Sequence, residues 1–150
     1  MDDLTIEQRH KNMQRIRSKD TQIEMILRRA LWKEGIRYRK NYKALPGKPD
    51  IAITKYRIAI FCDGEFFHGN DWETLQLKLQ NSNNSTYWLR KIERNIQRDL
   101  EVEKQIRAED WIVIRFWGND IKHNLDACIA VVKETIQERI LSDYTDLIKY

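Results

Sequence analysis

Two short apolar segments with only two residues between them constrain the fold most. Ile51 to Thr54 and Arg57 to Cys62 are rich in isoleucine and alanine, and Lys55-Tyr56 separates them. Runs of this length joined by so short a connection predict a β-hairpin. With the turn near residues 55 and 56, residue 50 lies opposite about residue 61.

Acidic residues stand at both outer ends of this hairpin. Asp50 begins the first strand and Asp63 ends the second. Directly opposed positions are ~5 Å apart, so the two carboxylates can converge, and they repel each other unless a cation lies between them. Oxygen ligands favour Mg²⁺, which stabilises charge on a phosphodiester. The hairpin is therefore interpreted as a phosphodiesterase site, although Asp after Pro49 or before Gly64 is by itself typical of a turn.

The remaining segments predict a mixed α/β fold. A helix begins at Thr21, where Thr21-Gln22-Ile23-Glu24 fits a capping box, and it ends before Gly35. Further elements follow: a strand over 36–39, a turn over 45–49, a long helix over 86–108, a strand over 111–117, a turn over 118–120 and a helix over 124–141. Leu100 and Ile140 are assigned to the buried faces of the two later helices. This order indicates a small mixed sheet with helices packed on it.

Length and composition add weaker constraints. The 150 residues suit one domain, with a basic N-terminal arm over about 1–20, and the net charge of +4 is compatible with nucleic acid. Cys62 and Cys128 form no C-x-x-C pair, which disfavours a cysteine-based zinc site and favours free thiols. The acidic N-terminus is unlike a signal peptide, and no apolar run approaches the ~18 residues of a membrane span. We expect a cytoplasmic protein without membrane contact.

Five further residues each have a functional and a structural interpretation. Histidine exchanges protons readily near neutral pH, so His68 suits a general acid or base, or else a surface or capping position. Glu24 fits the capping box, and it also lies near the hairpin if the first helix packs there. Phe66 and Phe67 cannot both point inward on a regular strand, so one suits base stacking or a wedge into a duplex, with packing under the loop as the alternative. Trp88 likewise has two interpretations: it packs in the core, or it wedges into DNA.

Five stretches together resemble the very-short-patch-repair (Vsr) family of mismatch endonucleases, a branch of the PD-(D/E)XK nuclease superfamily. They run from about residue 9 to residue 117 in the family's order: "RHKNMQRIRSKDTQIE", "LPGKPDIAI", "IAIFCDGEFFHG", "YWLRKIERNIQRD" and "WIVIRFW". The resemblance implies a restriction-endonuclease-like fold, Mg²⁺ as cofactor and double-stranded DNA as substrate.

The resemblance also assigns roles to single residues. Asp50 matches the family's metal-binding aspartate, and Cys62 stands where a threonine offers its backbone carbonyl to Mg²⁺. His68 matches the histidine that acts on the water or the phosphate, and Glu24 matches an acidic residue of the N-terminal helix at the active site. The DNA contacts that it implies are three wedging aromatics and four polar residues of the arm and the long helix: Phe66, Phe67, Trp88, Lys11, Asn12, Lys91 and Asn95.

The chain departs from the family pattern in two respects. Asp63 stands where the mismatch enzyme has a second histidine, and an aspartate there could bind the metal ion directly. Glu65, Gly69 and Asn119 fall at or near positions of the family's zinc ligands, so no structural zinc is expected. These changes bear on strict G·T mismatch specificity, and they leave phosphodiester cleavage in place.

The first hypothesis is a Mg²⁺-dependent DNA endonuclease in which Asp50 and Asp63 hold the metal, His68 handles the proton and Glu24 assists. Nicking at a T·G mismatch left by deaminated methylcytosine competes with restriction-type cutting of paired DNA. Both are compatible with a functional link to a DNA cytosine methyltransferase. A catalytically inactive DNA-binding descendant is the second hypothesis, and an RNA or structure-specific nuclease is a third. The oligomeric state stays open.

Overall fold

The computed structural model describes residues 20–64, 71–80 and 85–148. At its centre is a four-stranded sheet in the order β1 (Arg39–Lys40), β2 (Ile51–Ile53), β3 (Ile58–Asp63) and β4 (Ile112–Trp117). The neighbours β1, β2 and β3 are antiparallel, whereas β3 and β4 run parallel. The small mixed sheet predicted from the sequence is therefore confirmed.

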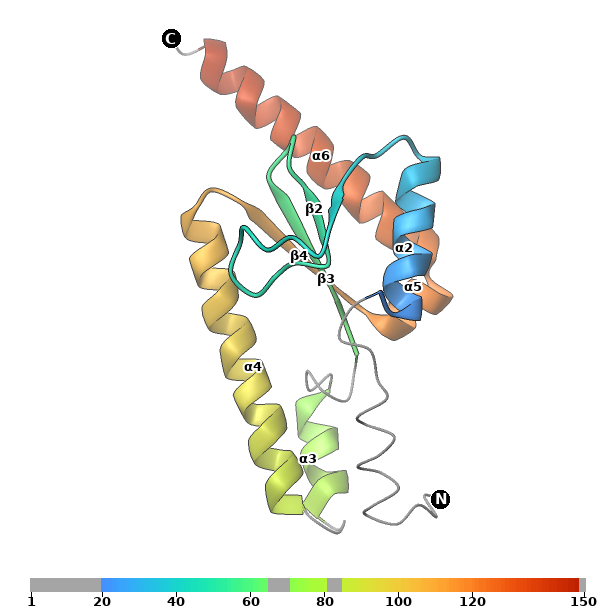
Figure 1. Cartoon of the computed structure of the whole chain (residues 1–150), viewed down its shortest axis with the longest axis vertical. Helices are drawn as coiled ribbons and strands as arrows, with labels where there is room; N and C mark the ends of the chain where they lie inside the picture. Colours follow the sequence, from blue (N-terminus) through green and yellow to red (C-terminus); the bar gives the residue numbers. More distant parts are fainter. Residues whose placement is uncertain (1–19, 65–70, 81–84, 149–150) are drawn as a thin grey trace.

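Helices cover both faces of this sheet. Within the described ranges they are α2 (Gln22–Lys33), α3 (Trp72–Gln80), α4 (Ser85–Ala108), α5 (Gly118–His123) and α6 (Leu125–Ile148). One side of the sheet carries α2, α5 and α6, and the other carries α4 (Figure 1). The short helix α3 packs beside the first half of α4, beyond the end of β3 (Figure 1).

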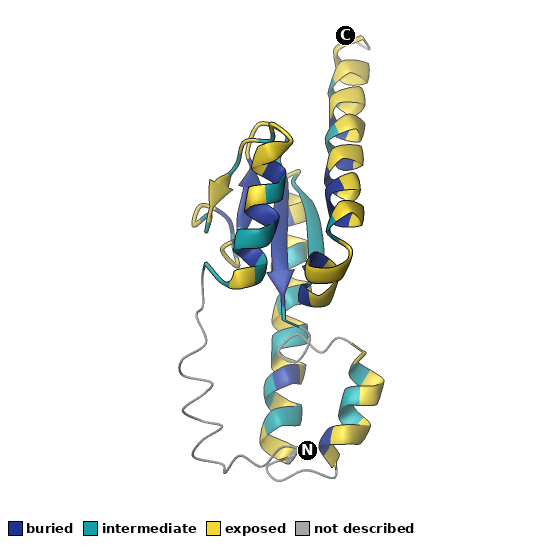
Figure 2. Cartoon of the chain, turned by 90° about the vertical axis from the view of Figure 1, so that its right-hand side faces the viewer, coloured by how far each residue is buried: buried dark blue, intermediate teal, exposed yellow. Residues whose placement is uncertain are grey.

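The central strand β3 is buried along its whole length and separates two cores (Figure 2). Ile60 and Cys62 pack with side chains of α2, α5 and α6, whereas Ala59 and Phe61 pack with a smaller cluster that includes α4. This alternation follows from the pleat of the strand, which sends successive side chains to opposite faces. A strand buried on both faces has to be apolar throughout, and this explains the continuous apolar run in the sequence.

The predicted hairpin is present. Ile51 pairs with Ile60 and Ile53 pairs with Ile58. Arg57 was expected to begin the second strand, but its φ of 55° takes it out of the extended region and into the turn. The hairpin therefore holds its predicted register with a strand that is one residue shorter at its start.

Two elements differ in kind from the sequence predictions. Residues 118–120, predicted as a turn, begin helix α5. Ile121 is fully buried in the main core, and this packing stabilises the helical turn. Helix α3 was not predicted at all. Its sequence WETLQLKLQ has no regular apolar stripe, and of its described side chains only Leu79 is buried.

Other differences concern boundaries and exposure. The strand predicted over 36–39 is displaced to β1, whose two residues are both exposed. The last helix continues past residue 141 to Ile148. Leu100 and Ile140, both assigned to buried faces, are 58% and 48% exposed. Neither side chain belongs to the two cores that the described residues form.

The two cysteines are free, buried thiols. Burial raises the pKa of both Cys62 and Cys128, so they stay protonated and unreactive at neutral pH. None of the helices in the described ranges is long and apolar enough to cross a bilayer.

Candidate active site

Asp50 lies immediately before β2, at the end of the sheet where β3 finishes. The pairing of Ile51 with Ile60 places Asp50 opposite Phe61, as the hairpin predicted. The Asp50 Oδ2 atom accepts a hydrogen bond of 2.8 Å from the backbone N–H of Cys62. This bond holds the carboxyl group across the open end of the hairpin, next to the residue that precedes Asp63.

A tight loop brings Asp50 to this position. Gly47 and Lys48 within it have φ values of 72° and 49°. The loop also lies against α4, because a Cβ atom added at Gly47 would come within 2.5 Å of a methyl carbon of Val102. Glycine is therefore needed here both for its backbone conformation and for its lack of a side chain.

Glu24 is brought to Asp50 by the first turn of α2. It is 3% exposed, and its Oε2 atom accepts a hydrogen bond of 3.3 Å from the backbone N–H of Thr21. The Glu24 and Asp50 carboxyl groups lie close enough for Glu24 to raise the pKa of Asp50. The two interpretations that the sequence left open are thus both realised: Glu24 caps α2, and it lies at the acidic end of the hairpin.

The electrostatics of Asp50 reflect these surroundings. Burial is the main reason that the pKa of Asp50 is raised to about 7. The hydrogen bond from the Cys62 N–H opposes the rise, whereas the charges of Glu24 and Asp63 add to it. Carboxyl groups crowded in this way favour a proton or a cation between them. The donor set consists of oxygens only, so these residues fit a hard divalent cation such as Mg²⁺.

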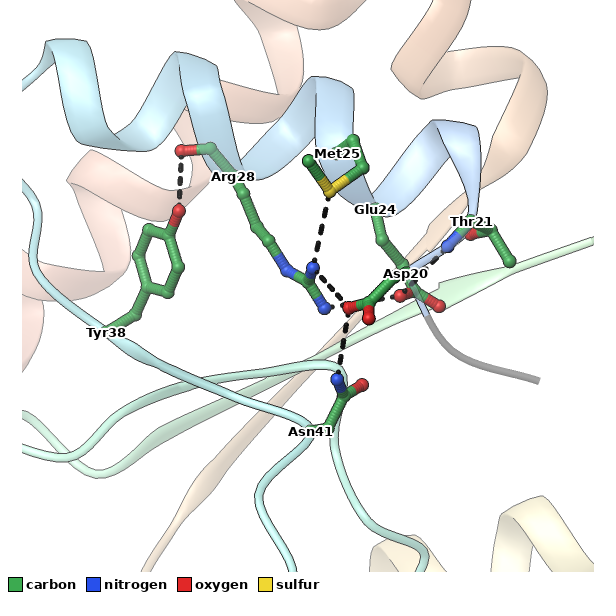
Figure 3. A network of polar contacts seen from close by, with 7 residues as sticks. All are labelled: Asp20, Thr21, Glu24, Met25, Arg28, Tyr38 and Asn41. Atoms are coloured by element: carbon green, nitrogen blue, oxygen red, sulfur yellow. Dashed lines mark hydrogen bonds and ion pairs between the residues drawn. The ribbon is translucent and has the colours of Figure 1, made fainter. Parts of the chain in front are cut away.

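Arg28 joins the start of α2 to the loop before Asp50 (Figure 3). Its guanidinium donates to Asp20 Oδ1 over 2.7 Å and to Glu24 Oε2 over 3.3 Å. The same Asp20 oxygen accepts from Asn41 Nδ2 over 3.2 Å, and the Asn41 N–H donates to the Asp50 carbonyl over 3.0 Å. Arg28 is not among the site residues predicted from the sequence, although its i,i+4 spacing from Glu24 was a usable signal.

Asp63 ends β3 and is 4% exposed. Its Oδ2 atom accepts a hydrogen bond of 2.7 Å from Nη1 of Arg115, on the neighbouring strand β4. Arg115 in turn pairs with Glu103 and approaches Asp99 to 3.7 Å, both on α4. Arg115 is not among the predicted site residues either. It is a lone charge within the apolar strand "WIVIRFW", and a buried charge needs a partner, so this pattern could have indicated an ion pair.

The first half of α4 carries aromatic and polar groups along one face. Trp88, Lys91 and Asn95 follow one another at helical spacing, and the Trp88 and Tyr87 rings meet edge-to-face at 5.1 Å. Lys91 Nζ lies 5.8 Å from the centroids of both rings. The Asn95 side chain accepts a hydrogen bond of 2.5 Å from Arg98. Tyr87 is 53% exposed and Trp88 is half-buried, so the Tyr87 ring reaches the surface of the helix.

Five of the predicted site residues lie outside the described residues: His68, Phe66, Phe67, Lys11 and Asn12. The positions compared with zinc ligands, Glu65 and Gly69, lie there too, whereas Asn119 belongs to α5. Within the described ranges, no three His, Cys, Asp or Glu side chains are grouped so as to hold a metal ion. Among these residues a cation would thus meet a carboxyl pair, and its other ligands would be backbone oxygen, water or phosphate, as is typical of Mg²⁺.

A mixed sheet flanked by helices, with carboxyl groups at the end of its central hairpin, is the architecture of a restriction-endonuclease-like nuclease. Residues 1–74 match the sequence profile of the family described as DNA mismatch endonuclease Vsr. The chain is 47% identical to the Type II nicking enzyme V.NmeDIP of Neisseria meningitidis serogroup C, over 93% of each chain. It is 40% identical to the Type II nicking enzyme V.HpaIIP of Haemophilus parainfluenzae, over 93% of this chain and 98% of that one.

A more distant relative carries the family's own name. The chain is 32% identical to the DNA mismatch endonuclease Vsr of Escherichia coli strain K12, over 90% of this chain and 85% of that one. The chain therefore belongs to the Vsr endonuclease family, and the resemblance inferred from its five motifs is confirmed.

Proposed function

We propose that the protein is a Mg²⁺-dependent endonuclease that nicks one strand of double-stranded DNA at T·G mismatches. The observation that carries the metal-dependent part is the closeness of the half-buried Asp50 to the buried Glu24, where the pKa of Asp50 is raised to about 7. Two relatives are named nicking enzymes and a third is named a DNA mismatch endonuclease. These names support nicking and a mismatched substrate.

Asp50 and the backbone carbonyl of Cys62 would hold the metal ion. When bound, Mg²⁺ would stabilise negative charge on the phosphodiester and polarise a water molecule. Only the carbonyl of Cys62 would take part, so the replacement of the family's threonine by a buried thiol leaves this contact intact. Glu24, fixed by Arg28 and by the Thr21 N–H, would accept a hydrogen bond from water at the same end of the hairpin.

The proton transfer is assigned to His68, which lies outside the described residues. A histidine suits this step because its neutral and protonated forms are both accessible near neutral pH. The reaction would leave a nick with the charge of the departing oxygen balanced by the metal ion or by this histidine. Asp50 itself would serve as a metal ligand and would not act as a base.

DNA would be gripped by the N-terminal arm and by the exposed face of α4. Lys91 offers a charge to a phosphate, and Asn95 offers an amide to a phosphate or a base edge. Trp88 and the two phenylalanines would wedge beside the mismatch, where a mispaired step is easier to unstack than a paired one. Lys11 and Asn12 would contribute from the arm.

The biological setting follows from this substrate. T·G mismatches arise when methylcytosine is deaminated. The enzyme would therefore act at sites that a DNA cytosine methyltransferase has methylated. We expect it to act in the cytoplasm, where such a DNA substrate is found in a bacterial cell. A monomer would nick one strand, whereas a dimer could cut both. Restriction-type cutting of paired DNA and binding without cleavage are the alternatives that an experiment has to separate.

The decisive experiment compares two duplexes that differ in one base, one fully paired and one with a single T·G mismatch, in a sequence context taken from methylated sites of the source genome. Each is incubated with Mg²⁺ and with EDTA. We expect Mg²⁺-dependent nicking of the mismatched duplex alone. Cutting of both duplexes would indicate a restriction-type enzyme, and binding without cutting would indicate an inactive descendant.

Two matched variants show whether any cutting comes from this site. Asp50→Asn keeps the size of the side chain and removes its charge, and it should abolish nicking. Asp146→Asn makes the same chemical change on an exposed position of α6 and should leave nicking unchanged. Nicking that survives Asp50→Asn would contradict the assignment of the metal to this end of the hairpin.

A further inference from the structure

Each of the two acidic neighbours of Asp50 has an arginine of its own. Glu24 pairs with Arg28 at 3.3 Å, and Asp63 pairs with Arg115 at 2.7 Å. Among the described residues no lysine or arginine forms an ion pair with Asp50; its carboxyl group meets the Cys62 N–H and the Glu24 carboxyl group. The charge of Asp50 is therefore the one that a cation would balance.

The geometry of β3 and β4 explains why Arg115 reaches Asp63. The two strands are parallel, with Phe61 opposite Arg115 and Asp63 opposite Trp117. Residues two apart on a strand share a face, so Phe61, Asp63 and Arg115 all project toward α4. The Arg115 guanidinium carbon lies 4.2 Å from the centroid of the Phe61 ring. The ring supports the long side chain, and the guanidinium meets Asp63 at its tip.

Helix α4 holds the other side of the same guanidinium. Nε of Arg115 pairs with Glu103, and Nη2 lies 3.7 Å from Asp99. The Arg115 side chain is only 19% exposed and that of Asp63 only 5%. A guanidinium fixed from three directions in this way cannot turn aside at little cost, because it would give up its ion pairs with the buried Asp63 and with the partly buried Asp99 and Glu103.

This arrangement makes Asp63 a poor ligand for a cation. A carboxylate whose oxygen already accepts a charged hydrogen bond has a lower affinity for a second positive charge. A divalent ion bound to Asp63 would also lie close to the Arg115 guanidinium and would be repelled by it through a partly buried, weakly screening environment. Asp63 was predicted to bind the metal from its place in the hairpin, and that local pattern does not reveal the pairing with Arg115.

We propose that Arg115 is a positioning residue that neutralises Asp63 and keeps it out of the coordination of the metal, so that metal binding depends on Asp50. The inference rests on the proposed metal-dependent function. It adds a second consequence: through Asp99 and Glu103, Arg115 fixes the DNA-contacting helix α4 to the strand that ends at the metal site. Asp63 thus anchors α4 and does not bind the ion.

The test measures Mn²⁺ binding directly, by electron paramagnetic resonance of the free ion, in the full-length protein without DNA. Asp50→Asn should weaken binding at least about thirtyfold, whereas Asp63→Asn should change the dissociation constant by less than about threefold. Arg115→Met should tighten binding by about tenfold, because it removes the guanidinium that balances the Asp63 carboxylate and repels the ion. The double variant Asp63→Asn with Arg115→Met should return the dissociation constant to the wild-type value.

Two further variants separate positioning from general loss of structure. Arg115→Lys keeps the charge and should keep the wild-type Mn²⁺ affinity. Arg57→Met removes another partly buried arginine, whose partners are Asp110 and Asp143, and should lower the thermal midpoint without changing Mn²⁺ affinity. Circular dichroism melting curves for every variant identify those that fold.

The outcomes divide cleanly. A tenfold weaker Mn²⁺ affinity in Asp63→Asn would overturn the proposal, because Asp63 would then be a ligand. An unchanged affinity in a folded Arg115→Met protein would overturn the neutralising role. If the wild-type protein itself bound no Mn²⁺, the proposed metal dependence would fail and this inference with it. That failure is distinguishable from the other two because it appears before any substitution is made.

Discussion

Asp50 and Asp63 lie at the same end of one hairpin, and their electrostatic surroundings are opposite. Asp63 has a guanidinium at 2.7 Å, whereas among the described residues Asp50 has only a backbone N–H at 2.8 Å and a second carboxyl group. Asp63 is the more deeply buried of the two, and its charge is nevertheless the one that has a cationic partner. The presence or absence of one buried cationic partner decides which aspartate needs a metal ion or a proton.

Glu24 extends the comparison to a third carboxyl group. Like Asp63 it is buried and paired with an arginine, but it also contacts Asp50. Glu24 is therefore intermediate between Asp63 and Asp50: Arg28 balances its charge, whereas the neighbouring Asp50 carboxyl group repels it. This arrangement concentrates the unbalanced charge of the site on Asp50.

The largest expected effect comes from exchanging the two aspartates for asparagine one at a time. Asp50→Asn should lower the nicking rate by about a thousandfold, equal to about 4 kcal/mol of transition-state stabilisation, while duplex binding stays the same or tightens. Asp63→Asn should lower it far less. Single-turnover nicking and gel-shift titration on the same duplex measure both quantities, and equal losses in the two variants would remove the distinction between them.

The next largest effect is expected on stability, from removing Arg28, the arginine that pairs with Glu24. Arg28→Met should lower the free energy of unfolding by about 3 kcal/mol, because it leaves the buried Glu24 carboxylate without its arginine. Lys133→Met, which breaks an exposed pair with Glu34, should cost less than about 1 kcal/mol. Urea denaturation followed by circular dichroism gives both values. Similar losses in the two variants would mean that the Arg28 pair stabilises no more than a surface pair.

The pH dependence of stability provides a third test. In the folded protein the pKa of Asp50 is raised to about 7 from its ordinary value of 3.8, so between these values the folded state binds more protons than the unfolded state. Stability from this group is therefore present at low pH and is lost as pH rises toward 7. With EDTA present, wild-type protein should lose roughly 2 kcal/mol between pH 5 and pH 8 relative to Asp50→Asn. Parallel pH curves for the two proteins would contradict the raised pKa of Asp50.

The smallest effect is expected on α4, the helix that Arg115 joins to Asp63. Lys91→Ala should weaken duplex binding by about three- to tenfold and reduce the slope of log affinity against log salt concentration by about 1. Lys55→Ala, in the turn at the opposite end of the hairpin, is the matched control and should change neither. A salt slope that Lys91→Ala leaves unaltered would mean that this face of α4 does not contact phosphate.

The hairpin, its register and the convergence of Asp50 with Asp63 could be predicted because they depend on local properties. A six-residue apolar run, a short connection and the period of two are visible in the chain, and the pleat then dictates which residues are opposed. The helix beginning after Thr21 was predictable for the same reason, since a capping box is a local motif. The assignment to the Vsr family likewise depended on motifs and their order, which need no tertiary structure.

Long-range contacts decided the rest. Helix α5 forms because Ile121 is buried in a core built from distant segments, and α3 forms beside α4 without an apolar stripe of its own. The pairing of Asp63 with Arg115 joins residues 52 positions apart, so no local pattern could reveal it. Sequence pattern placed carboxyl groups at one end of a hairpin; the packing of β4 and α4 determined which of them is left without a cation, because charge compensation depends on what lies nearby in space.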